Sequence, residues 1–461
     1  MSSLLLLFIG VLALILGYIF YGGWLSKQWG VDGERPTPAH TDYDGVDYCP
    51  AKAPVLLGHH FASISGAGPI NGPIQAAIFG WIPVFLWVVL GGIFFGAVQD
   101  FSSLLASIRH KGKSIGYVIE QNVGPHAKRL FLIFSYLTLL LVVAAFASIV
   151  VGTFNGFAAD GAKVAANGST ASISMLFIVV SIIFGFAVYR KNTPLGVSTV
   201  LGVLGIIICI ALGLKFPVYL GSTAWLIIIL IYIFIASVTP VWILLQPRDY
   251  LNSFLLYGMM IAAFIGIIFT NPTIELPAFT GFTGITGKSQ LFPLLFITVA
   301  CGAISGFHSL VGSGTTAKQL DKEKDAKPIG YGGMLIECAL AIISLIAVGI
   351  LFKDGAMPGG TPTQVFATGV ATMISNIGID NIYDVTYALI ILSVSAFCLT
   401  SLDTATRLAR YMLQELFVSE NDDPAKLTGI KRTREHVENN VACCFARSFS
   451  GVFDCDSPFN I

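Results

Sequence analysis

The chain has 461 residues, of which 55% are hydrophobic and only 11% are charged, and its formal net charge is zero. This composition excludes an ordinary soluble domain and predicts a polytopic membrane protein. The balanced charge, without a basic block interleaved with aromatic residues, argues against nucleic acid as a partner. The eight cysteines show no C-x-x-C spacing, so we expect no disulfide framework, no metal and no cofactor.

Apolar runs long enough to cross a hydrocarbon core of roughly 30 Å follow one another along the chain. They are predicted at 3–24, 78–108, 129–157, 171–190, 195–215, 222–245, 252–270, 330–352 and 384–417. Two further runs, about 55–76 and 291–314, are interrupted by glycine and other small residues. Together they predict an all-α polytopic membrane protein with about eleven transmembrane segments.

The two interrupted runs carry a similar motif. Residues 58–69 read GHHFASISGAGP and residues 306–315 read GFHSLVGSGT. Glycine at this density weakens a helix, and backbone groups freed in hydrocarbon are tolerated only where they line a cavity or a site. Paired interruptions in two halves of a membrane protein are typical of a transporter's substrate site. The alternative is that these glycines only permit close helix packing.

The distribution of positive charge predicts an orientation. If both interrupted runs cross, one side holds all of the 26 Lys and Arg residues except Lys163, Lys215, Lys288 and Lys353. The positive-inside rule places that side, with the C-terminus, in the cytoplasm and the N-terminus outside. The interrupted runs then cross in opposite directions, which predicts inverted repeats that rock around a site at the membrane midplane.

Several motifs in order resemble the carbon starvation protein A (CstA) family. Besides 58–69, they are GAVQDF at 96–101, GKS at 112–114, QPRDYLN at 246–252 and TSLDTATR at 400–407. The resemblance runs from about residue 18 to about residue 420. It implies a carrier of the bacterial plasma (inner) membrane for peptides or pyruvate, proton-coupled in some members, with a fold like that of the amino-acid/polyamine/organocation transporters.

The chain departs from the family pattern at two places. Gln99 stands where the pattern has His before Asp100, which weakens the case for a proton relay at that position. The family continues past Asp403 with further membrane helices, whereas residues 418–461 are polar. We therefore expect an N-terminal helix and cytoplasmic loop at 1–54, a CstA-like transporter core at 55–417 and a truncated or aberrant tail at 418–461.

The candidate substrate-binding residues lie at the interruptions. Free backbone N–H groups and a helix N-terminus at 63–68 and 309–314 would receive a substrate carboxylate, and histidine titrates near neutral pH. The predicted set is His59, His60, Ser63, Ser65, Gly66, Gly68, His308, Ser309, Gly312 and Gly314. Adjacent histidines point about 100° apart on a helix, so His59 and His60 are not expected to share a metal. Hydrogen-bonded core histidines are the alternative.

Three acids within apolar runs are candidate proton-coupling sites, because an unpaired carboxylate in a membrane is costly. Asp100 is predicted about nine residues before the end of its helix, on a face that it shares with Ser103 and Ser107. Glu337 is a proton site or a partner for His308.

The third acid, Asp403, precedes Arg407 by four residues, so an intrahelical pair is the alternative to proton coupling. Arg248 and Asp249 are predicted in a short cytoplasmic turn after Pro247, where they pair with each other or cap helix ends.

These observations predict a secondary active transporter that imports small carboxylates, peptides or pyruvate, with a proton as the coupling ion and lipid as its surroundings. The predicted chemistry is recognition, with no catalytic residue. The competing hypothesis is an intramembrane metal-dependent enzyme that uses His59, His60 and His308.

Overall fold

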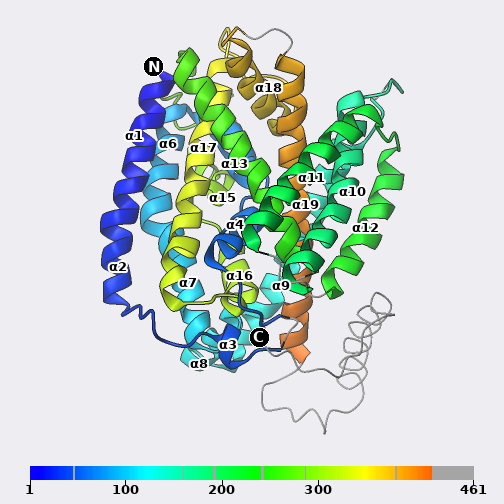
Figure 1. Cartoon of the computed structure of the whole chain (residues 1–461). Helices are drawn as coiled ribbons and strands as arrows, with labels where there is room; N and C mark the ends of the chain where they lie inside the picture. The colour runs from blue at the N-terminus through cyan, green and yellow to red at the C-terminus, as the bar shows by residue number, and fades with distance from the viewer. Residues whose placement is uncertain are drawn as a thin grey trace.

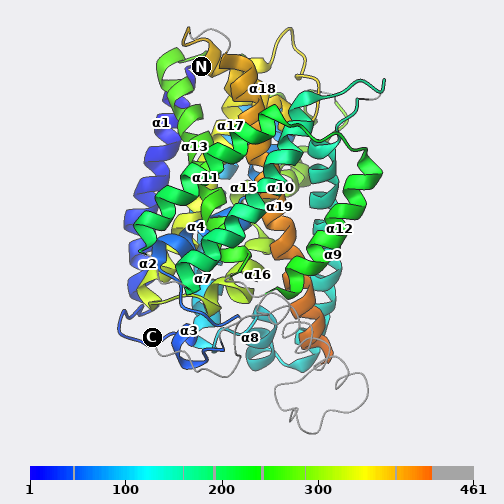
Figure 2. The ribbon, with the colours of Figure 1, turned by 45° about the vertical axis from the view of Figure 1, so that its right-hand side comes forward.

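The computed structural model describes residues 1–44, 47–158, 160–190, 194–239, 243–285, 287–378 and 382–417. In these ranges the protein is helical, and the only β-type pairing is a few isolated bridges. Figures 1 and 2 show long helices side by side in one bundle, with the N-terminus at the upper end and the short helices α3 and α8 at the lower end. The predicted all-α class is confirmed.

The elements follow in chain order, with η marking 3-10 or π turns. They are α1 (Ser3–Leu16), η1 (Gly17–Tyr21), α2 (Gly22–Gln28), α3 (Pro38–Thr41), α4 (Ala53–Ile64), α5 (Gly68–Ala76), η2 (Ala77–Phe79), α6 (Trp81–Leu86), η3 (Trp87–Gly96), α7 (Ala97–Arg109), α8 (Ile115–Asn122), α9 (Pro125–Phe154), α10 (Ala165–Gly185), η4 (Phe186–Arg190), α11 (Leu195–Lys215), α12 (Ser222–Val238), α13 (Leu245–Thr270), α14 (Leu291–Thr298), α15 (Ala300–Ala303), α16 (Gly306–Gly314), η5 (Thr316–Lys318), η6 (Glu323–Asp325), η7 (Lys327–Tyr331), α17 (Gly332–Leu351), α18 (Pro362–Ser375) and α19 (Ile382–Phe417).

Eight helical stretches in the described ranges are long and apolar enough to cross a bilayer. They are Ser3–Gln28, Trp81–Arg109, Pro125–Phe154, Ala165–Val188, Gly196–Lys215, Leu245–Thr270, Glu323–Leu351 and Ile382–Leu413. A shorter apolar helix, Ser222–Ser237, lies in the one remaining uninterrupted run, 222–245. The predicted count of about eleven crossings also includes this shorter helix and the two interrupted runs. That count therefore stays a prediction.

Burial separates central from peripheral helices. In the stretches that contain α17 and α19, 78% of the most apolar window is buried, against 22% for α9. The outer helices expose large apolar side chains, such as Leu141 on α9 and Phe234 on α12. In a bilayer these side chains face lipid tails, whereas the polar groups gather around the central helices.

Both interrupted runs break the helix, and they run in opposite directions. The first starts near Ala51, which bridges to Leu320 at the lower end, and it finishes where Ile78 pairs with Ile285 at the other end. Its break lies between α4 and α5, within the predicted 63–68. The second run descends through α14, α15 and α16. The antiparallel course agrees with the expected inverted repeats, which stay a prediction.

The second break differs from the prediction. Ser309, Gly312 and Gly314 lie inside α16, so residues 309–314 offer no free N–H groups and no helix N-terminus. The helix stops earlier, at Ile304 and Ser305, whose backbone is extended. Small residues were compatible with a continuous helix here because they let it pack closely against its neighbours.

The loops are grouped at the two ends as the charge pattern predicted. At the lower end, the guanidinium groups of Arg35 and Arg109 both pair with Glu323, at 3.0 and 2.9 Å. At the opposite end, the backbone N–H of Ile274 donates to the carbonyl of Met1, and that of Glu275 to the carbonyl of Gly349. Residues 418–461, the predicted aberrant tail, lie outside the described residues.

Candidate functional site

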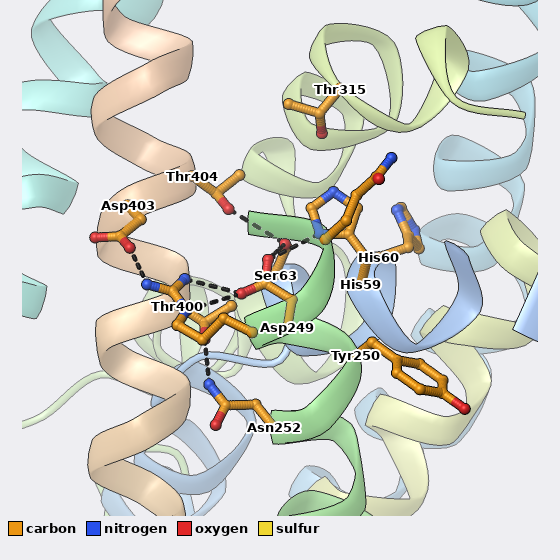
Figure 3. A network of polar contacts seen from close by, with 12 residues as sticks. His59, His60, Ser63, Asp249, Tyr250, Asn252, Thr315, Thr400, Asp403 and Thr404 are labelled. Atoms are coloured by element: carbon orange, nitrogen blue, oxygen red, sulfur yellow. Dashed lines mark hydrogen bonds and ion pairs between the residues drawn. The ribbon is translucent and has the colours of Figure 1, made fainter. Parts of the chain in front are cut away.

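A polar network surrounds the first break and joins α4 to α13. The ring Nδ1 of His59 on α4 lies 2.8 Å from Oδ2 of Asp249 on α13, and Ser63 Oγ donates to the same oxygen at 3.4 Å. Figure 3 shows these side chains facing one another. All three are fully buried. The predicted residues His59 and Ser63 therefore share an acid that the sequence interpretation had placed in a turn.

The third wall of this site is α19. Ser401 Oγ donates to the carbonyl of Ser63 at 3.0 Å, and Thr404 Oγ1 donates to Ser63 Oγ at 3.2 Å. Because α4 ends one residue later, the carbonyl of Ser63 lacks a helical partner. The hydroxyl of Ser401 satisfies it instead. The helix that carries Asp403 thus holds the end of α4 in place (Figure 3).

Arg248 lies at the centre of the network, only 1% exposed. Its Nε and Nη2 donate to Asp249 Oδ1 at 3.2 and 2.8 Å, its Nη1 pairs with Asp403 Oδ2, and Nη1 also donates to the hydroxyl of Tyr232 at 2.5 Å. The Tyr232 hydroxyl in turn donates to Asp403 Oδ2 at 2.6 Å. One guanidinium therefore bridges two carboxylates from α13 and α19.

Two predictions about these residues were wrong in part. Arg248 and Asp249 do pair with each other, but inside α13, which begins at Leu245 and buries both side chains. Proline at 247 is compatible with this because a first-turn N–H has no helical acceptor. Asp403 does not pair with Arg407, which instead reaches Asp47 and the carbonyls of Ala236 and Thr239.

A second buried cluster lies beside the second break. His308 on α16 places Nδ1 2.9 Å from Asp100 Oδ2 on α7, and Nε2 3.1 Å from Glu337 Oε2 on α17. All three side chains are fully or almost fully buried. The predicted contact between Glu337 and His308 is confirmed. The predicted polar face of α7 is also confirmed, because Ser103 and Ser107 are buried next to α16.

Gln99 has a structural part in this region. Its Nε2 donates to the carbonyl of Ser305 at 3.2 Å, at the point where the second helix is broken. A carbonyl freed in hydrocarbon needs such a donor. The amide at the position where the family pattern has histidine therefore stabilises the break.

His60 lies between the two clusters. Its Nδ1 is 2.8 Å from Thr316 Oγ1 in η5, and a Cβ on Gly333 of α17 would lie 3.3 Å from Cδ2 of its ring. Nε2 of His60, like Nε2 of His59, is buried and has no hydrogen-bond partner in the described part of the chain. Each ring therefore has one nitrogen for a further partner.

The remaining predicted residues contribute mainly to packing. A Cβ on Gly66 would lie 2.7 Å from Phe146 Cζ, and one on Gly68 would overlap Cys301, so both glycines allow close approach. Gly314 does the same against Leu408. The hydroxyl of Ser309 donates to the carbonyl of Gly306 in its own helix, and a Cβ on Gly312 would make only ordinary contacts with Ser103 and Leu104. Ser65 Oγ is buried at the first break.

The histidines predicted for a metal enzyme do not converge. Among the described residues, the group with metal-ligand spacing is Cys301, His308 and Glu337, whose donor atoms lie within 4.8 Å of one another. His59 and His60 are bonded to Asp249 and Thr316 instead. Both ring nitrogens of His308 already face carboxylates, so the arrangement has the character of a buried ion-pair cluster.

The sequence interpretation missed Arg248 and Tyr232 as site residues. Tyr232 lies in an apolar run and gave no signal, whereas Arg248 lies in the QPRDYLN motif that carried the family resemblance. A second member of that motif, Asn252, donates to Thr400 Oγ1 at 2.7 Å. Two motifs that are far apart in the chain therefore meet across α13 and α19 (Figure 3).

Comparisons with known proteins agree with this arrangement of motifs. The profile of the family described as "Carbon starvation protein CstA" matches residues 2–358 and 353–454. The "Peptide transporter CstA" of Bacillus subtilis (strain 168) is 34% identical over 90% of this chain and 75% of its own length. The protein of the same name from Escherichia coli (strain K12) is 34% identical over 95% of this chain and 70% of its own length.

A relative with a different name is also similar. The "Pyruvate/proton symporter BtsT" of Escherichia coli (strain K12) is 36% identical over 76% of this chain, which spans about half (49%) of its length. No solved structure matches the chain. With its bundle of apolar helices and its match to the family over nearly the whole sequence, this multi-pass membrane protein belongs to the carbon starvation protein CstA family of transporters.

Proposed function

We propose that the protein is a secondary active transporter that imports a small carboxylate nutrient, a peptide or pyruvate, together with a proton during carbon starvation. The observation that carries the proposal is the pair of buried charged clusters, one at each helix break. Charges are rare inside membrane proteins and are typical of substrate and ion pathways. The names of the relatives point to the same two substrates and, for one relative, to a proton.

The proposed orientation follows from the charges of the loops. The lower end, which carries Arg35, Arg109 and the end of α19, is the more basic end and would face the cytoplasm. The N-terminus, at the other end, would lie outside the bacterial plasma membrane. Uptake then runs from the end near Met1 toward the end near Glu323.

The proposed proton sites are Asp100, Glu337 and Asp403. Each is buried and has at least one carboxylate oxygen without a hydrogen-bond partner among the described residues. Each also lies next to a cation or a histidine that can exchange partners. A proton on any of them would remove one negative charge from the membrane interior, which would ease the movement of one half against the other.

The proposed substrate site is framed by the first break. His59, His60 and Ser63 would form its polar side, together with Ser65 and the glycines Gly66 and Gly68 at the break itself. Of the residues predicted in the second run, His308 would act through its two acids, and Ser309, Gly312 and Gly314 would shape the surface of α16. The backbone N–H of Gly68, the first residue of α5, would add a donor for an anion.

Uptake into proteoliposomes tests this function. Purified protein is reconstituted, and accumulation of labelled pyruvate and of labelled dialanine is measured with and without an inward proton gradient. The proposal expects accumulation of at least one of them above its external concentration only when the gradient is present. Equal uptake with and without protein would contradict transport, and accumulation that ignores the gradient would contradict proton coupling.

A further inference from the structure

The guanidinium of Arg248 is the only cation in direct contact with the described polar network at the first break, and it is shared between two acids that come from different helices. Asp249 follows Arg248 in α13 and is held additionally by His59 and Ser63. Asp403 comes from α19 and is held additionally by Tyr232 from α12. The two acids are therefore unequal: Asp249 is fixed next to the arginine, whereas Asp403 reaches it across a helix interface.

A small cavity of about 10 Å³ between α10, α13 and α19 borders the same guanidinium. Its polar residues are Arg248, Asn252 and Ser174, and its apolar wall includes Ile173, Phe177 and Leu392. The side-chain oxygens of Asn252 and Ser174 are buried and have no hydrogen-bond partner in the described ranges. At this size the cavity holds at most about one water molecule, so a substrate carboxylate reaches Arg248 only after the helices move apart.

We propose that Arg248 binds the substrate carboxylate and that a proton on Asp403 frees Arg248 to do so. The inference rests on the proposed function and names the chemistry of its site. In the structure Asp403 pairs with Nη1 of the guanidinium. When Asp403 takes up a proton, the O–H bond that forms removes its charge, and the carboxylate of the incoming substrate replaces it at the guanidinium. Asp249 stays bound and acts as a positioning residue.

Charge balance explains why this exchange couples proton transport to carboxylate transport. Arg248 with two ionised acids carries one net negative charge, and Arg248 with Asp249, protonated Asp403 and one substrate carboxylate carries the same charge. A proton alone or a carboxylate alone would change the charge of a fully buried site by one unit, which is costly in a membrane. Only the empty and the doubly loaded forms then reorient readily, and one proton accompanies each carboxylate.

The other ionisable groups near Asp403 do not replace it in this role. Tyr232 on α12 and His59 on α4 are bonded to the two acids, and Asp249 faces Asp403 across the guanidinium. Arg407, one turn further along α19, is turned away toward Asp47. A substrate carboxylate can therefore replace Asp403 at Arg248 while Arg248 and Asp249 stay paired within α13.

Equilibrium binding to purified full-length protein tests the inference, with labelled pyruvate and labelled dialanine as separate probes between pH 5.5 and 8. For the wild type, affinity should fall as the pH rises, with a limiting slope of about tenfold per pH unit for one proton taken up per carboxylate. Asp403→Asn should bind with an affinity that does not change with pH. Arg248→Gln should weaken binding about tenfold to a hundredfold at every pH. If only one of the two probes shows this pH dependence, that probe identifies the substrate as pyruvate or as a peptide.

Asp403→Asn should remain folded because Arg248 keeps Asp249 as its counter-ion, and its melting temperature checks this. Asp403→Glu is the matched control and should restore the pH dependence. A pH dependence like that of the wild type in Asp403→Asn, or unchanged affinity in Arg248→Gln, would overturn the inference.

If Asp403→Asn does not fold, the test is proton uptake by the wild type when it binds substrate, and the absence of proton uptake would overturn the inference. Failure of the wild type to bind either probe would overturn the proposed function as well, whereas binding that ignores pH would overturn only this inference.

Discussion

Asp403 on α19 and Arg248 on α13 form an ion pair in which the side chains are 0% and 1% exposed, and Tyr232 closes the triangle with a hydrogen bond to each. Removing one partner of a buried ion pair generally destabilises a protein, because the other charge stays buried without a counter-charge. Here Asp249 provides a second counter-charge for Arg248. The site can therefore lose the negative charge of Asp403 and stay balanced, as the proposed exchange requires.

The cluster at the second break should respond differently to substitution. His308→Ala leaves the acids Asp100 and Glu337 facing each other in a buried site, so we expect destabilisation of about 3–5 kcal/mol. Adding Glu337→Gln to that variant should recover part of the loss, because one of the two acids is then neutral. Thermal melting of the purified single and double variants measures both effects. A double variant that melts lower than His308→Ala would contradict the ion-pair arrangement.

Substitution of Gly68, which is closely packed, should destabilise the protein more than substitution of Gly312. Gly68→Ala places a methyl group on Cys301, where α5 packs on α15, and overpacking of this kind typically costs about 1–3 kcal/mol. Gly312→Ala is the matched control, because its Cβ would lie 3.6 Å from Ser103 Oγ, an ordinary contact. We expect a clearly lower melting temperature for the first variant and little change for the second. Equal effects of the two substitutions would show that packing at Gly68 is looser than described.

Low pH should weaken the contacts that Asp47 makes at the lower end of the bundle. Asp47 pairs with Arg407 and accepts a hydrogen bond from Tyr411 at 2.6 Å. Burial alone would raise the pKa of Asp47, but Lys318, Arg407 and Arg410 outweigh it and hold the pKa below its ordinary value. A lowered pKa means that these contacts stabilise the folded state above about pH 4 and that the stabilisation is lost as the pH falls further.

The variant Asp47→Asn tests that dependence. Its melting temperature should lie below that of the wild type at pH 7, and the difference should shrink as the pH falls below about 4. Asp44→Asn, on the same loop, controls for a general effect of charge. A difference that is constant with pH would mean that the ionised form of Asp47 has no special role.

The orientation can be tested by labelling. In a cysteine-free background, single cysteines at 113 and 324 should be protected from a membrane-impermeant maleimide added to intact cells, because both positions belong to the basic end. Cysteines at 163 and 288 should react. Labelling of position 113 from outside would reverse the proposed direction of uptake.

Much of the fold could be predicted from the sequence because the bilayer selects long apolar helices, and these are visible in the residue pattern. The first break was also predictable, since glycine and serine at 63–68 coincide with it. The second was misplaced by several residues, because glycine density shows where a helix is weak and not where it ends. The carbonyl of Ser305 at this break accepts a hydrogen bond from Gln99, about two hundred residues earlier in the chain, and such a partner is not visible in the local sequence.

The centre of the site was harder to predict for a similar reason. Proline followed by two charges suggests a turn, so Arg248 and Asp249 were assigned to the surface. They are buried because Arg248 also pairs with Asp403 and Asp249 is also hydrogen-bonded to His59, and these partners lie 155 and 190 residues away in the sequence. The i,i+4 spacing of Asp403 and Arg407 offered a local pair that the tertiary contacts override. His308 and Glu337 were paired correctly because both lie next to the second interruption.

Proton movement driven by substrate tests the central claim most directly. Proteoliposomes that contain a pH-sensitive dye are prepared with equal pH on both sides, and pyruvate or dialanine is added outside. The account predicts that substrate entry acidifies the interior, by about one proton for each carboxylate, beyond the change in protein-free liposomes. Substrate entry through the protein with no acidification above that background would contradict proton-coupled carboxylate transport.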